Sequence, residues 1–141
     1  MNAALMGGKK VKGRKRHIAT DIMGNLLVVK VHAANIHDTM GGCHVYQAAK
    51  NKYPDIEGAC VDEGYKGTFV SFVTTKYGDR VDVSEKIKPK QWEILPKRWR
   101  VERTFAWANN SRRLSKDYEI LTSSEENIFM ISHLHTLLKR L

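Results

Sequence analysis

Residues 59–67 read "ACVDEGYKG", and this stretch says most about the fold of the chain. The apolar run at 59–61 predicts a short buried strand, which Asp62 and Glu63 follow directly, before a Gly-Tyr-Lys-Gly turn. A carboxylate at the end of a buried strand either caps the next helix or holds a cation. From these residues alone, both uses of Asp62 stay open.

The whole chain has 141 residues, of which 42% are hydrophobic and 28% charged, and we expect one globular domain over 1–141. Its formal charge of +9 favours an anionic partner such as nucleic acid. No apolar stretch approaches the roughly 20 residues that span a bilayer, so the sequence predicts a cytoplasmic protein with no membrane partner. Cys43 and Cys60 are expected to be small buried side chains rather than a disulfide or metal ligands.

The segments on either side of the 59–61 strand predict an α/β arrangement with a mixed sheet. The expected elements, in order, are a hairpin with its turn at 23–25, a helix over 38–52, the central strand, a helix ending at Gly78, a strand over 80–85, a helix beginning near Pro96 and a C-terminal amphipathic helix over 123–141. Asp38 is predicted to cap its helix, and Ser123 with Glu126 to form a capping box.

A second unusual stretch, "GGKKVKGRKRH" at 7–17, holds six cations, and no acid precedes Asp21. We predict that 1–17 is a basic loop or arm that contacts the DNA backbone, with salt-sensitive affinity. Its predicted DNA contacts are Lys9, Lys10, Lys12, Arg14, Lys15 and Arg16. Further along the chain, the predicted contacts are Arg98, Arg103, Arg112, Arg113 and Lys116.

The helix in "LPKRWRVERTFAWANN" (95–110) has an apolar face of Val101, Phe105 and Ala108. Arg98 and Glu102 fall on another face, four residues apart, and this spacing also suits an ordinary exposed ion pair. Helical spacing favours core positions for the tryptophans at 99 and 107, whereas the role of the one at 92 stays open.

A carboxylate that leaves a strand, a second one on a later helix and a basic surface together indicate metal-dependent phosphodiester chemistry. Divalent cations that bind phosphate prefer hard carboxylate ligands, which Asp62 and Glu102 can supply. The two residues are far apart in sequence, so tertiary folding must bring them together.

Five stretches, in this order, carry a family resemblance: "GKKVKGRKRHIATD", "VHAANIHD", "VDEGYKG", "LPKRWRVERTFAW" and "SRRLSKDYE". They resemble the catalytic domain of DDE-class transposases of bacterial insertion sequences. The resemblance implies an RNase H-like (ribonuclease H/integrase type) mixed sheet flanked by helices, and three acidic residues that bind two Mg²⁺ or Mn²⁺ ions. Asp62 matches the second acidic residue, Glu102 the third, and Arg98 a family arginine.

The chain departs from the family pattern at three positions. Leu95 and Asn109 stand where the family has a tyrosine and a basic residue. The family's first aspartate lies on its first strand, but residues 1–20 hold no Asp or Glu. We therefore expect an N-terminal truncation, with the first strand missing or poorly replaced by 3–6. Asp21 falls at the wrong end of the sheet to substitute, and Asp38 is expected to cap a helix rather than bind metal.

Two functions follow from the resemblance. The first is DNA transposition, by metal-dependent cleavage and transfer of strands of double-stranded DNA, with Asp62 and Glu102 as catalytic metal ligands. The alternative is a catalytically inactive remnant that binds DNA, self-associates, or associates with an intact transposase. A basic protein-interaction domain unrelated to DNA ranks below both, and would bind its partner without strong dependence on salt.

Overall fold

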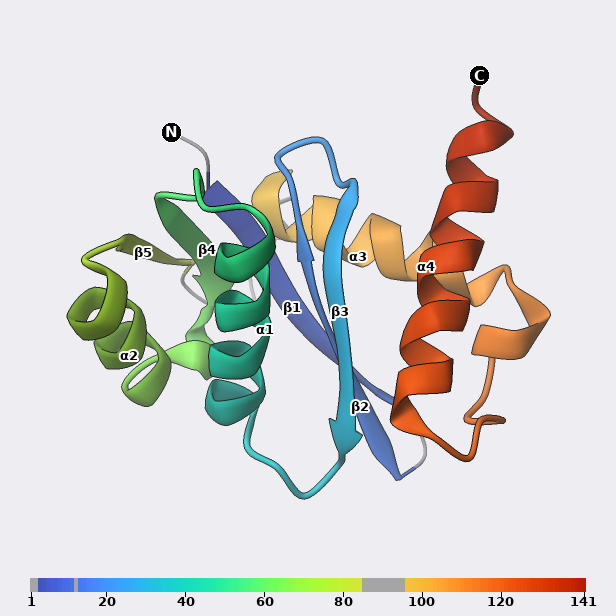
Figure 1. Cartoon of the computed structure of the whole chain (residues 1–141), viewed down its shortest axis with the longest axis horizontal. Coiled ribbons are helices and arrows are strands. Elements are labelled where there is room, and N and C mark those ends of the chain that lie inside the picture. The colour runs from blue at the N-terminus through green and yellow to red at the C-terminus, as the bar shows by residue number, and fades with distance from the viewer. Residues whose placement is uncertain (1–2, 12, 85–95) are drawn as a thin grey trace, which may run out of the picture.

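The computed structural model describes residues 3–11, 13–84 and 96–141, in which five strands form one mixed sheet (Figure 1). The strands are β1 (Ala3–Val11), β2 (Arg14–Thr20), β3 (Leu26–Ala33), β4 (Gly58–Asp62) and β5 (Arg80–Ser84). They lie in the order β3-β2-β1-β4-β5. β1, β2 and β3 are antiparallel neighbours, whereas β4 runs parallel to β1 and β5 parallel to β4. The predicted α/β class with a mixed sheet is confirmed.

The expectation that the first strand is missing is wrong. β1 is the middle strand of the sheet, and it continues past residue 6 to Val11. Small residues at 3, 4, 7 and 8 weaken its sequence signal, because strand propensity is highest for β-branched and aromatic residues. Burial between two layers of helices stabilises the strand instead: Ala4 and Leu5 are almost completely buried, on opposite faces of the sheet.

Two layers of helices cover the sheet (Figure 1). α1 (Asp38–Lys52) and α2 (Thr68–Tyr77) pack on one face, where their residues Tyr46 and Phe69 join one core. α3 (Pro96–Asn109) and α4 (Thr122–Leu138) cover the other face, where Phe105 and Phe129 join a second core. Two short 3₁₀ helices, η1 (Glu63–Tyr65) and η2 (Arg112–Leu114), follow β4 and α3. None of these helices, within the described ranges, is long and apolar enough to cross a membrane.

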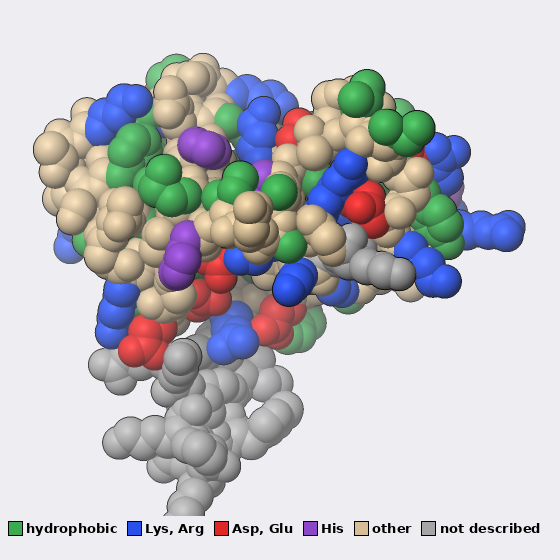
Figure 2. All heavy atoms as spheres, turned by 90° about the horizontal axis from the view of Figure 1, so that it is seen from below, with side chains coloured by type: hydrophobic (Ala, Val, Ile, Leu, Met, Phe, Trp, Pro, Cys, Tyr) green, Lys and Arg blue, Asp and Glu red, His purple; other side chains and the backbone are tan. Residues whose placement is uncertain are grey.

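The predicted basic loop over 1–17 is instead a hairpin made of β1 and β2. Arg16 is only 1% exposed, and its guanidinium donates hydrogen bonds to Glu125 of α4 and to the carbonyl oxygens of Leu114 and Lys116. Arg14 pairs with Glu125 as well. Viewed from below, the surface mixes acidic and basic side chains (Figure 2). Much of the surplus charge of this stretch therefore stabilises the fold and is not free to contact DNA.

The C-terminal helix begins and packs differently from the prediction. Its N-cap is Leu121, whose apolar side chain cannot accept a cap hydrogen bond, and Glu126 accepts a hydrogen bond from the backbone of Val31 instead of closing a capping box. The side chains that α4 buries are Glu125, Phe129 and His133. Four apolar residues of the segment predicted as an amphipathic helix are instead exposed: Ile131, Leu134, Leu138 and Leu141.

Other local predictions agree with the structure. The hairpin turns at 21–25, where the carboxylate of Asp21 accepts hydrogen bonds from the backbone of Met23 and Asn25. α2 ends at Gly78 and α3 starts at Pro96. Cys43 and Cys60 are buried and unpaired. Asp38, in contrast, does not cap α1, because the N-cap is His37.

Candidate active site

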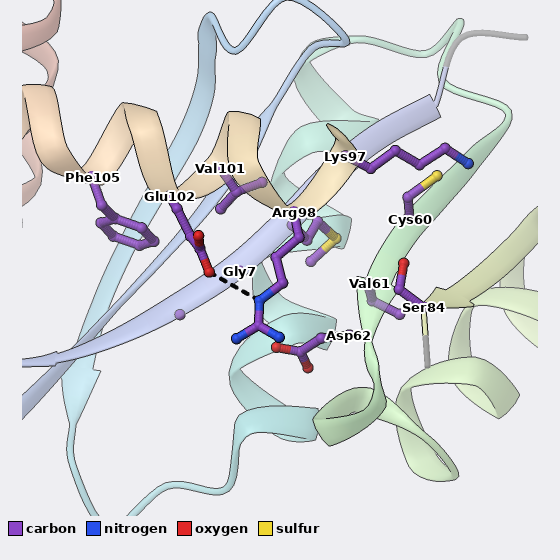
Figure 3. Close-up of a pocket in the computed structure, with 12 residues that line it drawn as sticks. Gly7, Cys60, Val61, Asp62, Ser84, Lys97, Arg98, Val101, Glu102 and Phe105 are labelled. Carbon is purple, nitrogen blue, oxygen red and sulfur yellow. Dashed lines mark hydrogen bonds and ion pairs between the residues drawn. The ribbon is translucent and has the colours of Figure 1, made fainter. Parts of the chain in front are cut away.

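A pocket of about 110 Å³ lies beside the middle of β1 and at the carboxyl ends of β4 and β5, under the start of α3 (Figure 3). Asp62 comes from β4, Ser84 from β5, and Arg98 and Glu102 from α3. The carboxyl ends of parallel strands meet at one edge of a sheet, where α/β folds commonly bind ligands. Folding thus brings the two carboxylates predicted from the sequence into one pocket.

Asp62 is the last residue of β4, and its carboxylate serves both uses that the sequence left open. Oδ1 accepts a hydrogen bond of 2.9 Å from the backbone of Gly64, which makes Asp62 the N-cap of η1. The other oxygen, Oδ2, has no hydrogen-bond partner among the described residues. The cap fixes the orientation of the carboxylate and leaves one oxygen for a ligand.

Glu102 and Arg98 form an ion pair across one turn of α3, with 2.9 Å between Arg98 Nε and Glu102 Oε1. Their side chains are 49% and 59% exposed. An exposed pair of this spacing contributes only about 0.3–0.5 kcal/mol, so either side chain can exchange its partner cheaply. Figure 3 shows the guanidinium between Glu102 and Asp62, where a cation would interact with both.

No carboxylate projects into the pocket from β1. Leu5 pairs with Cys60 in the parallel register, so Gly7, two residues later, lies beside Asp62 and lines the same pocket. A Cβ atom at Gly7 would come within 2.7 Å of Val101 Cγ1, a distance that real Cβ contacts do not reach. A side chain at position 7 therefore requires Val101 to move or to become smaller.

The donor set fits one divalent cation better than two. Two carboxylates in an open pocket suit Mg²⁺, which keeps several water ligands and takes one or two carboxylates. Within the part of the chain that the structure describes, no group of three or more His, Cys, Asp or Glu side chains is arranged to hold a metal. The two-ion site implied by the family resemblance would need further ligands.

Lys97 also lines the pocket, and the sequence analysis did not single it out. Its ammonium lies 2.7 Å from Asp82 Oδ2, and this hydrogen bond raises the pKa of Lys97. Burial raises the pKa of the neighbouring Cys60 thiol, so it stays protonated and is a poor ligand for a hard cation. Two features of the sequence could have indicated this contact: the alternating polar and apolar residues of 80–85, which include Asp82, and the position of Lys97 next to Arg98.

Asp38 lies away from this pocket, among residues of the opposite layer. It pairs with Lys15 at 2.8 Å; although partial burial acts in the opposite direction, this hydrogen bond keeps the pKa of Asp38 below its usual value. His17 Nδ1 lies 2.7 Å from His32 Nε2, next to this ion pair. Burial, together with the charge of His32, lowers the pKa of His17 to about 4. The structure therefore gives Asp38 an ion-pair role.

The remaining predicted DNA contacts have different surroundings. Lys10 is exposed on β1 and Lys9 is half-buried, whereas residue 12 lies outside the described residues. Arg112 and Lys116 are exposed, and no acid pairs with either within 96–141 or the other described ranges. Arg113 pairs with Glu119.

The prediction that the two tryptophans of α3 are core residues is wrong for Trp99, which is 46% exposed. Trp107 is half-buried. The guanidinium of Arg103 lies between them, 4.8 Å from the Trp99 ring centre and 4.7 Å from that of Trp107. Arg103, which was predicted to contact DNA, therefore has its guanidinium engaged with these two rings. The tryptophan at 92 lies outside the described residues.

Comparisons with known proteins agree with this geometry. A family model described as "Transposase DDE domain" matches residues 5–137. The curated proteins include no match to the chain. Among solved structures, the catalytic core domain of BIV integrase is similar in fold, with a TM-score of 0.54 and 9% identity over 94% of this chain and 81% of that one. The expected sheet of ribonuclease H/integrase type is confirmed.

Proposed function

The chain belongs to the transposase DDE domain family, whose function is DNA transposition, and from this premise we propose that Asp62 and Glu102 support divalent-cation-dependent cleavage and transfer of DNA strands. One observation carries the proposal. Two carboxylates from distant parts of the sequence line one pocket, Asp62 half-buried and Glu102 59% exposed, with a guanidinium beside them. A merely structural ion pair would not need Asp62, which has no cation partner among the described residues.

Each side chain has a distinct role in this proposal. Asp62 and Glu102 would hold one Mg²⁺ or Mn²⁺ ion, which supplies Lewis-acid activation of a phosphate oxygen when bound. Arg98 would leave Glu102 and donate to a non-bridging phosphate oxygen, because a guanidinium fork matches phosphate geometry. Phosphoryl transfer depends mainly on such positioning and charge stabilisation, so few groups are needed.

The substrate of this chemistry is double-stranded DNA, held through its backbone. Lys10, Arg112 and Lys116 are exposed cations without an acid partner in the described ranges, which supports phosphate contacts that carry no sequence information. Binding through such contacts weakens strongly as salt rises.

A second candidate is an inactive domain that binds DNA or an intact transposase. The observation that favours it is Gly7, because β1 supplies no third carboxylate to the pocket. Two carboxylates bind a cation more weakly than three, since each adds attraction at short range. Both candidates share the fold and the basic surface, and they differ in whether the pocket supports cation-dependent cleavage of DNA.

Nicking of supercoiled plasmid in Mn²⁺ tests the proposal. We expect nicking by the wild type, and loss of at least 100-fold in Asp62→Asn and in Glu102→Gln, the scale of lost electrostatic stabilisation at an active site. Asp82→Asn is the matched control, because Asp82 is an exposed carboxylate near the pocket whose ion-pair partner among the described residues is Lys97. Equal activity in all four proteins would mean a contaminating nuclease.

The same assay separates the two candidates. If the wild type does not nick DNA but binds it, the second candidate is supported. We then expect the double variant Gly7→Asp with Val101→Ala to gain Mn²⁺-dependent nicking, because it adds a carboxylate beside Asp62 and removes the Cγ1 contact. Electron paramagnetic resonance of bound Mn²⁺ reports on the site independently of nicking.

A further inference from the structure

A groove of about 730 Å³ lies between the end of α3 and α4, on the right-hand side of Figure 1. We call it the α3–α4 groove. Its apolar lining consists of Trp107, the half-buried Ile128 and the exposed Ile131, and its polar lining includes hydroxyl and amide groups such as those of Asn110 and Ser132. It is much larger than the catalytic pocket and more open to solvent.

The ionisable side chains that line this groove are all basic or histidine. They are Arg113, His135, Lys139 and Arg140. No carboxylate lines it, and the sequence from Asn127 to Leu141 holds no Asp or Glu. Lys139 and Arg140 are exposed and have no acid partner among the described residues, whereas Arg113 pairs with Glu119. The groove thus concentrates positive charge that the protein itself leaves mostly unneutralised.

The indole of Trp107 holds one of these cations in a defined position. The guanidinium of Arg140 lies 4.7 Å from the centre of the Trp107 ring, as does that of Arg103. A guanidinium over an indole is attracted by the ring quadrupole and keeps its N–H edges free. Those edges can donate two parallel hydrogen bonds to a phosphate. The arrangement costs less entropy on binding than a freely moving arginine would.

The groove and the catalytic pocket lie on different flanks of α3. The pocket is closed by β1 and β4, whereas the groove is closed by α4, which packs over β3. Along the helix axis, Asn110 of the groove is eight residues after Glu102, or about 12 Å. This spacing spans several phosphates of a DNA strand, so one ligand group cannot occupy both sites.

From this charge, this size and this position, we infer that the α3–α4 groove binds the phosphodiester backbone of duplex DNA outside the catalytic pocket. The inference rests on the proposed function for the identity of the polyanion. Lys139 and Arg140 are the groove cations without an acid partner among the described residues, so about two phosphates can be neutralised, each contributing about 0.9 to the slope of log affinity against log salt. The contacts reach backbone only, and sequence preference is not expected from them.

Equilibrium binding of a random-sequence 24-base-pair duplex, followed by fluorescence anisotropy in EDTA between 50 and 300 mM KCl, tests the inference. Lys139→Gln with Arg140→Gln should lower the salt slope by about 1.8, which corresponds to about 60-fold weaker binding at 100 mM KCl when the two salt lines meet at 1 M. The matched control is Lys52→Gln with Lys76→Gln, which removes the same charge from exposed positions of α1 and α2 on the other face of the sheet. Its slope should stay within about 0.3 of the wild type.

Two further measurements keep the result interpretable. Lys139→Gln alone should lower the slope by about 0.9, and it leaves the Arg140 stack on Trp107 intact, so misfolding does not explain the loss. Equal slopes for the groove and control variants would overturn the inference and favour an acidic protein as occupant. The binding experiment is done in EDTA, which removes divalent cations, so absence of DNA binding by the groove does not affect the nicking result. Conversely, loss of nicking together with normal DNA binding by the groove rejects only the proposed function.

Discussion

Two arginine-rich segments, β2 and the start of α3, use similar residues in opposite ways. In β2, Arg16 is 1% exposed and pairs with an equally buried Glu125. In α3, Arg98 is 49% exposed and pairs with Glu102 at the pocket. Both are Arg–Glu pairs, yet only the second can exchange its partner for a ligand without unfolding. Burial, rather than residue type, separates a cation that stabilises the fold from one that can serve a site.

Breaking the buried pair should have the largest effect. Glu125→Ala leaves Arg16 buried without its carboxylate partner, and we expect the free energy of unfolding to fall by about 3–5 kcal/mol. Urea unfolding followed by circular dichroism measures this change. The control is Glu102→Ala, which breaks the exposed pair and should cost less than about 1 kcal/mol. Similar losses in both variants would show that burial does not distinguish the two pairs.

His17, the neighbour of Arg16 in β2, gives a second test of how burial affects an ionisable side chain. His17 is buried on the other face of the sheet and stays neutral, since its pKa falls from 6.5 to about 4. The unfolded chain therefore takes up a proton below pH 6.5 that the folded chain refuses until about pH 4. The stabilisation is complete above pH 6.5 and declines by about 3 kcal/mol as the pH falls to 4.

Urea unfolding between pH 7 and 4.5 measures that decline. The variant His17→Gln should flatten this part of the profile even if its absolute stability is lower, because the titrating imidazole is gone. The exposed His44 provides the control, as His44→Gln should keep the wild-type slope. Lys15, His32 and Asp38 also face His17, and a slope unchanged by His17→Gln would show that His17 is not the source of the decline.

The sequence predicted a mixed sheet flanked by helices and singled out Asp62 and Glu102, which the fold brings into one pocket, but it failed where a long-range partner decides the outcome. The periodicity of apolar residues located the helices, and turn residues located the β2–β3 hairpin, since both signals are local in sequence. Arg16 carries no local sign of burial, because its partner Glu125 is distant in sequence and meets it only after α4 packs on the sheet. β1 was missed because alanines and glycines have low strand propensity, although its neighbours on both sides hold it in place.

The smallest effect on stability is expected at Arg98, which tests whether an exposed Arg–Glu pair can exchange its partner for a cation. Arg98→Gln should change the free energy of unfolding by only a few tenths of a kcal/mol, because the pair it breaks is exposed. It should also raise Mn²⁺ affinity about tenfold, since the variant removes Coulomb repulsion between a guanidinium and a divalent cation roughly 6 Å away in water-like surroundings. Isothermal titration with Mn²⁺ checks this, with Arg112→Gln as a control far from the pocket. Unchanged affinity would mean that Arg98 does not share its place with a cation, and Glu102 would then act as a structural partner of Arg98, as Glu125 is of Arg16.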